Sequence, residues 1–169
     1  TDAAGQPAVD VPVVFRVVEN SGGLVSGTTT VGSLAVTTNA QGQASAGFRR
    51  YVFTVRPGIF FADDPAFKGR QRELTAADYV YTFKRFFDPR LHSDNLYLFE
   101  AERILGLAEL RRKAIAAKTP FPYDTEVEGL RVLDRYRLEI LVAAPSPRLP
   151  LLFTYAQTGA LAREVVDTY

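Results

Sequence analysis

Residues 74–89 read LTAADYVYTFKRFFDP and contain the start, the buried face and the end of one helix. Thr75 and Asp78 have the spacing of an N-cap and an acidic third position, which can bond the free amides of a first turn. Aromatic and apolar side chains then recur at three- and four-residue steps, at Tyr79, Val80, Phe83 and Phe86 or Phe87. Lys84 and Arg85 lie off that face, and Pro89 ends the run. The pattern predicts a helix whose aromatic face enters a core.

The flanking sequence predicts further elements of mixed type. Residues 51–55 form a compact strand pattern, and residues 128–142 alternate like a hairpin that turns at 134–136. The pattern of residues 101–118 predicts a second helix, with Arg111, Arg112 and Lys113 at its solvated end. A short apolar helix is expected near 151–155. The fold class predicted for this part is α+β, with two main helices and a β-hairpin.

The N-terminal 48 residues differ sharply in composition from the rest. They hold one of the 20 Lys and Arg residues, Arg16, and three of the 19 Asp and Glu residues. All aromatic residues except Phe15 and Phe48 lie beyond them. This change predicts a boundary that divides the chain into domains 1–48 and 49–169, although one domain with a polar, uncharged sheet edge would give the same pattern.

The first 48 residues show strand and turn signals. Val11, Val13, Phe15 and Val17 alternate with other residues, and residues 28–38 supply one or two more Thr- and Val-rich strands. Residues 37–44 have Asn and Gly at turn positions, which predicts a hairpin. These are β-sandwich-like strands. A segment of about 50 residues buries too little surface to be stable alone, so we expect it to need a packing partner.

Composition and charge exclude several classes of protein. The chain has no Cys, which rules out a disulfide framework and a Cys-based metal site. A net charge of +1 argues against nucleic acid as the main partner. No run reaches the roughly 18 apolar residues of a membrane helix, and the first residues do not resemble a signal peptide. Because the chain also lacks Met, we expect a processed product, an internal segment or an engineered one.

Few residues suggest chemistry. His92 is the only histidine, and no Ser or metal-ligand group is spaced to make it a general base or a zinc ligand. Asp63 and Asp64 lack the spacing of a calcium loop and suit an exposed turn. The basic loop 68–72 suits a solvated connector better than a phosphate site. We therefore expect neither an enzyme nor a metal or cofactor site.

The turn and strand motifs of residues 1–48 resemble half of a bacterial immunoglobulin-like repeat of the invasin and intimin type. The matching motifs are residues 1–7, 11–17, 22–23, 28–30 and 37–44. This resemblance implies a spacer or adhesion module at a bacterial surface, and no motif in it carries chemistry.

The remaining residues resemble the extracytoplasmic solute-binding proteins of family 5, which serve oligopeptide and dipeptide transporters. A strand and turn motif matches at Tyr51, Phe53, Arg56, Gly58 and Phe61, and a helix-opening motif matches along residues 74–85. The similarity continues through 93–99, 128–142 and 163–169. The loop 63–73 departs from the short turn of the family. The match covers only a fraction of a full-length member.

This second resemblance implies a binding protein that captures a peptide or another small solute outside the cytoplasmic membrane, in the periplasm or at the cell surface. Its implied partners are the membrane subunits of an ABC importer. It places residues 93–99 beside the ligand cleft, so Tyr97 and Asn95 are the candidate ligand-binding residues. The alternative for Tyr97 is a packed tyrosine at the start of a helix.

Two further hypotheses remain open. The immunoglobulin-like segment could set the role of the chain as a surface adhesion or spacer module. The chain could also be a natural or engineered chimera without either full activity. In a chimera, strand edges without their original partners could pair with a second copy, so we also expect a homo-oligomer.

Overall fold

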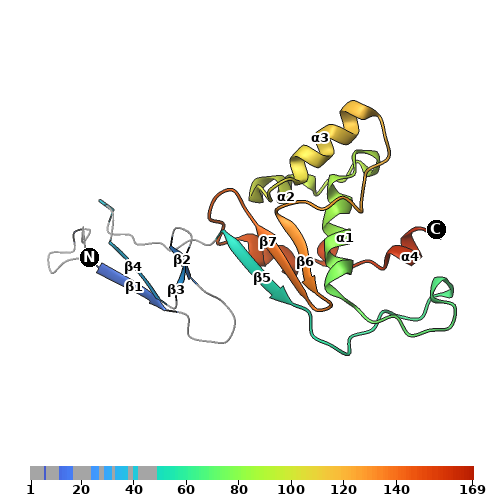
Figure 1. Cartoon of the computed structure of the whole chain (residues 1–169), viewed down its shortest axis with the longest axis horizontal. Helices are drawn as coiled ribbons and strands as arrows, with labels where there is room; N and C mark the ends of the chain where they lie inside the picture. Colours follow the sequence, from blue (N-terminus) through green and yellow to red (C-terminus); the bar gives the residue numbers. More distant parts are fainter. Residues whose placement is uncertain are drawn as a thin grey trace. The chain divides into compact units, whose positions relative to one another are not determined.

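The computed structural model describes residues 6, 12–16, 24–26, 29–31, 33–37, 40–41 and 49–169. The chain divides into two compact units, Thr1–Arg49 and Arg50–Tyr169. Both units contain strands, and the helices of the described residues all belong to the second (Figure 1). The α+β class predicted for the larger part is therefore confirmed.

The described strands of the first unit form two antiparallel pairs (Figure 1). Strand β1, Pro12–Arg16, pairs with β4, Ser33–Thr37, and β2, Leu24–Ser26, pairs with β3, Thr29–Val31. Ala40 and Gln41 form a turn inside the predicted hairpin segment, whose remaining residues 38–39 and 42–44 lie outside the described residues. The strand pairs do not confirm the predicted sandwich, which requires packed sheet faces.

The second unit contains a three-stranded antiparallel sheet in the order β5-β7-β6. Strands β6, Leu130–Asp134, and β7, Arg137–Leu141, form the predicted hairpin, and Arg135 and Tyr136 make its turn. Strand β5, Arg50–Thr54, pairs with the other edge of β7. Because β5 and β7 are far apart in sequence, this pairing holds the first residues of the unit against its later part.

Helix α1, Ala76–Phe87, packs on the sheet and builds the core as its aromatic spacing predicts (Figure 1). Phe83 and Phe87 are fully buried, as are Leu138 and Ile140 of the central strand β7. Burial of side chains this large gives each about 1.5–3 kcal/mol of stabilisation. The other residues of this core include Val55, Ala76, Val80, Phe99, Ile104, Leu107, Leu110, Leu130, Val142, Leu149 and Leu152.

The sheet buries a charge on its other face. Glu139 alternates with Leu138 and Ile140 on β7, and its carboxylate pairs with Arg50 at 2.5 Å and with Arg131. Burial alone would raise the pKa of Glu139, but hydrogen bonds from the two guanidinium groups outweigh it and hold the pKa below its ordinary value. One carboxylate thus joins all three strands.

The predicted helix 101–118 is wrong in its continuity. The structure has two helices, α2, Leu96–Glu102, and α3, Leu107–Ala117, separated by a turn in which Arg103 is left-handed with φ 51°. Backbone bonds of Leu105 to segments far along the chain hold the turn, so tertiary contacts override the local helix pattern. The three basic residues 111–113 consequently lie in the middle of α3.

Short helical segments complete the second unit. They are the 3-10 helices η1, Pro65–Phe67, η2, Pro89–Leu91, η3, Leu149–Thr154, and η4, Ala156–Thr158, and the α-helix α4, Arg163–Val166. The predicted short helix near 151–155 corresponds to η3. In the described part of the chain, each helix is too short or too polar to cross a lipid bilayer.

Candidate functional site

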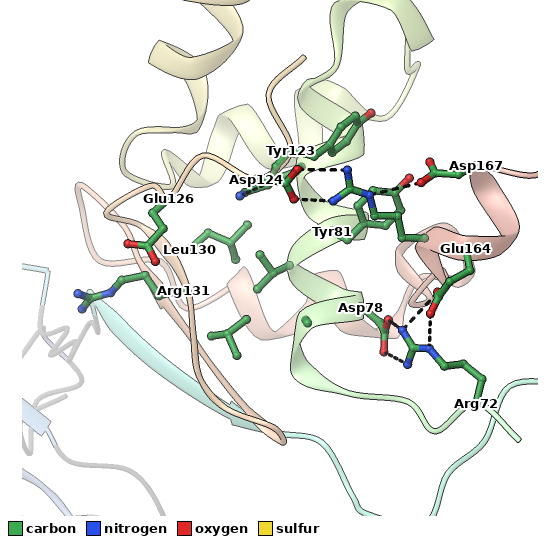
Figure 2. A pocket seen from close by; sticks show the side chains of 15 residues that line it. Arg72, Asp78, Tyr81, Tyr123, Asp124, Glu126, Leu130, Arg131, Glu164 and Asp167 are labelled. Atoms are coloured by element: carbon green, nitrogen blue, oxygen red, sulfur yellow. Dashed lines mark hydrogen bonds and ion pairs between the residues drawn. The ribbon is translucent and has the colours of Figure 1, made fainter. Parts of the chain in front are cut away.

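A cavity of about 610 Å³ opens between α1, β6, residues 123–126 and the C-terminal helix α4 (Figure 2). Nine of the 15 residues that line it are charged: Arg72, Asp78, Lys84, Asp124, Glu126, Arg131, Arg163, Glu164 and Asp167. Apolar side chains such as Val80 and Leu130 form part of its wall. The wall of the cavity therefore combines charged and apolar side chains. The positions of the charged groups determine which ligands it can bind.

The first group of charges centres on Arg72. Its guanidinium donates to both carboxylate oxygens of Asp78, at 2.6 and 3.1 Å, and its Nε donates to Glu164 at 2.8 Å (Figure 2). Burial would lower the pKa of Arg72, but the bonds to the two carboxylates outweigh it and raise the pKa. The interpretation of loop 68–72 as a solvated connector is wrong for Arg72, which links this loop to α1 and α4.

Asp78 also fixes the start of α1. Its carboxylate accepts hydrogen bonds from the backbone N–H of Thr75 at 2.7 Å and from the Thr75 hydroxyl at 2.8 Å. An acidic group at this position also interacts favourably with the positive end of the helix dipole. The predicted pairing of Thr75 with Asp78 at the helix start is confirmed, and the same carboxylate holds the ion pair with Arg72.

Lys84 is the buried cation of the cavity, with 5% of its surface exposed. Its ammonium donates to the carbonyl oxygens of Tyr123 at 2.7 Å and Thr125 at 2.8 Å. Burial lowers the pKa of Lys84, and the charges of Asp124 and Glu126 partly offset this effect. Sequence reasoning placed Lys84 off the core face, but the loop from Tyr123 to Thr125 covers it.

Arg163 closes another side of the cavity. It binds Asp124 at 2.5 Å and Asp167 at 3.5 Å, and its guanidinium lies 5.6 Å from the centre of the Tyr81 ring (Figure 2). Cation–π contacts of this kind orient the guanidinium over the ring face. These ion pairs connect Arg163 of α4 to the segment 123–126 and to Asp167 at the end of α4.

The predicted ligand-binding residues lie in two other cavities. Tyr97, on the first turn of α2, is 65% exposed and lines a cavity of about 220 Å³ with residues of η3. Asn95 precedes α2 and lines a separate cavity of about 350 Å³ with Thr82, Arg85 and other residues. The structure does not bring the two side chains into one pocket. Tyr97 is also not the packed residue of the alternative interpretation, and the ligand-binding role of both stays a prediction.

His92 and Asp64, for which the sequence predicted no catalytic or metal-binding role, lie at the ends of short helices. His92 is exposed and follows η2 in a left-handed conformation with φ 46°. Asp64 accepts a hydrogen bond from the backbone N–H of Ala66 at 2.8 Å and so caps η1. Among the described residues, no group of three or more His, Cys, Asp and Glu side chains is arranged to hold a metal ion.

The second unit thus combines a three-stranded sheet, packed helices and cavities lined by both charged and apolar side chains, in an α+β fold. The family of bacterial extracellular solute-binding proteins, family 5 Middle, matches residues 34–167, and the chain belongs to this family. The match begins at residue 34, inside the N-terminal domain 1–48 that the composition predicted.

A solved structure shares the fold. Its title is "Structure and mode of peptide binding of pheromone receptor PrgZ", and it aligns with a TM-score of 0.51 and 22% sequence identity over 75% of this chain. This chain covers 22% of the length of that protein. No curated protein matches the sequence significantly.

Proposed function

We propose that residues 50–169 are part of the peptide-binding component of an ABC importer, which acts outside the cytoplasmic membrane and leaves its solute chemically unchanged. The observation that carries this proposal is the family match over residues 34–167. The fold shared with a receptor described as peptide-binding adds support. The membrane subunits of the importer are the implied protein partners.

The side chains of the second unit suit such a role. Arg72, Lys84 and Arg163 are each bound by carboxylates or carbonyl oxygens of the chain, so these three cations are positioned before a ligand arrives. Preformed polar groups lower the ordering cost of binding. Tyr97 offers an exposed ring with a polar tip, which can lie along an extended peptide.

The test is ligand-dependent thermal stabilisation of the chain alone and of the chain joined after Tyr169 to the remainder of a family 5 protein. A ligand that binds only the folded state adds about 2.7 kcal/mol of stability at a concentration 100 times its Kd. We expect a peptide pool to raise the melting temperature of the joined chain, and an oligosaccharide pool to leave it unchanged. The proposal fails if no peptide pool produces a shift.

A second proposal concerns residues 1–48, the N-terminal domain that the composition predicted. The two antiparallel strand pairs between Pro12 and Thr37 favour a spacer or adhesion segment of immunoglobulin-like type, joined to the binding unit as in a chimera. Pull-down of bacterial surface components by the full chain, and its loss in a chain of residues 50–169, would support it. Equal pull-down by both chains would overturn it.

We also propose that the chain forms a homo-oligomer through strand edges. In the described sheet of the second unit, β5 and β6 each pair on one side only, with β7. Such an edge can pair with a second copy. Light scattering across a range of concentrations tests this, and a constant monomer mass would overturn it.

A further inference from the structure

The cavity beside Tyr97 is a groove in which large hydrophobic side chains remain exposed. Tyr97 of α2 is 65% exposed, and Leu151 and Tyr155, in and just after η3, are 53% and 45% exposed. All three line the same cavity of about 220 Å³, which also reaches the buried Leu152. Two aromatic rings and an aliphatic side chain thus converge on one small groove.

A buried acidic residue also lines this groove. Glu102, the last residue of α2, has only 6% of its surface exposed, and its Oε2 accepts a hydrogen bond from the Ser146 hydroxyl. Among the described residues it makes no ion pair with Lys, Arg or His, whereas the buried carboxylates Asp78, Asp88 and Glu139 each pair with an arginine. A buried charge without a counter-ion is costly, and its field is strong where water is scarce.

Arg148 lines the groove as well, but it forms no ion pair with Glu102. Its side chain is exposed and forms no ion pair with any described residue. An exposed guanidinium is screened by water and salt, while the buried carboxylate is not. Glu102 is therefore the buried charged residue of the groove, and Arg148 is the exposed one.

We propose that this groove binds a primary ammonium group, with Glu102 as its counter-ion and the rings of Tyr97 and Tyr155 beside it. Aromatic faces attract cations, and Leu151 offers apolar surface to the methylene groups that carry the ammonium. If the proposed peptide-binding function holds, the ammonium belongs to a lysine side chain or to the amino terminus of the peptide.

The first test is an NMR titration of the full chain at pH 7 with n-butylammonium, 1-butanol and butyrate, three probes of similar apolar length. We expect n-butylammonium to shift amide signals of α2 and η3 and to bind at least about tenfold more tightly than 1-butanol, because a charge-assisted bond to Glu102 is added. Equal binding of the ammonium and the alcohol, or tighter binding of butyrate that Arg148→Gln removes, would overturn the proposal.

Two matched variants distinguish the effect of the Glu102 charge from the effect of removing any negative charge from α2. Glu102→Gln keeps an acceptor for the Ser146 hydroxyl and should weaken n-butylammonium at least about tenfold. Glu100→Gln removes the same charge from an exposed position on the same helix and should leave the affinity unchanged. Equal losses in the two variants would overturn the role of Glu102. If Glu102→Gln does not fold, the double variant Tyr97→Leu, Tyr155→Leu replaces it, and unchanged binding there overturns the site.

Two further probes distinguish the sources of the ammonium. N-acetyl-lysine methylamide carries it on the side chain, and norleucine methylamide carries it at the amino terminus. Preferential binding of either one supports the site and names the source, and binding of neither overturns it. Because these probes are not peptides, the failure of peptide binding in the joined chain would leave this result intact, and the two proposals fail separately.

Discussion

Among the described glycines, Gly129 has the least room for an added side chain. Its N–H donates to the Leu105 carbonyl at 2.8 Å, and its own carbonyl accepts from the Leu141 N–H at 3.0 Å. A Cβ added at Gly129 would lie 2.3 Å from the Leu105 nitrogen and 2.7 Å from the Leu141 oxygen. The chain between α2 and α3, the start of β6 and the end of β7 can meet here only because this residue has no side chain.

We predict that Gly129→Ala destabilises the chain by about 3 kcal/mol, since overpacking against backbone atoms forces the segments apart. Urea denaturation followed by circular dichroism measures the loss. Gly159→Ala is the control, because its φ is −55° and its nearest contact is a milder 3.3 Å. Similar losses in both variants would contradict the steric explanation.

Glu139 gives the second prediction at this scale, a dependence of stability on pH. Its pKa in the folded chain lies below the unfolded value of about 4.3, so the ionised form stabilises the fold above that value. This contribution is lost as the pH falls through the folded pKa. Glu139→Gln should therefore cost about 2 kcal/mol at pH 7, and the difference from the parent should shrink below about pH 4.

Denaturation curves between pH 3 and 7 measure this difference. Glu109→Gln is the control, because Glu109 forms its ion pair with Arg112 on the exposed surface of α3, where such pairs contribute little. A constant difference between Glu139→Gln and the parent over the whole range would show that charge is not the cause.

At the scale of elements, the ion pairs of Arg72 connect three segments, the loop before α1, α1 itself and α4. We predict that Arg72→Gln increases hydrogen exchange in residues 163–168 and lowers stability by about 1–2 kcal/mol, because Asp78 and Glu164 lose their shared cation. Mass spectrometry of exchanged peptides measures the local change. Arg70→Gln, an exposed position in the same loop, should leave exchange in α4 unchanged. If α4 remained as protected from hydrogen exchange in Arg72→Gln as in the parent chain, the predicted role of Arg72 would be contradicted.

Elements that depend on local signals could be predicted from the sequence. Helix α1 begins at a capping pair and ends before a proline, and the β6–β7 hairpin alternates around a turn, so both follow from neighbouring residues. The break between α2 and α3 could not be predicted, because the bonds of Leu105 that fix it lead to Gly129 and Leu141. The local spacing of apolar residues gives no information about these distant partners.

The candidate sites likewise contain some residues that the sequence could indicate and others that it could not. Tyr97 could be proposed from a motif, but its neighbours in the groove, Leu151 and Tyr155, lie about fifty residues later and come together only through the packing of η3. The burial of Lys84 depends likewise on the distant carbonyl groups of Tyr123 and Thr125. Sequence patterns therefore identified Tyr97 in the groove and Asp78 as a helix cap, but not the ion pairs of the large cavity.

At the scale of the whole molecule, the family match and the second compact unit begin at different residues. The match begins at residue 34, while the second unit begins at Arg50. The buried residues of the main core cluster lie between Val55 and Leu152. This described core therefore belongs to the second unit.

We predict that chains of residues 34–169 and 50–169 both unfold cooperatively and that their melting temperatures differ by less than about 4 °C. A shift of that size corresponds to roughly 1 kcal/mol in a domain of this length, so a smaller one means that residues 34–49 add little to the core. Differential scanning calorimetry measures both transitions. A clearly higher melting temperature for the longer chain would move the boundary to the start of the family match, and a broad transition for residues 50–169 would show that this core needs the first unit to fold.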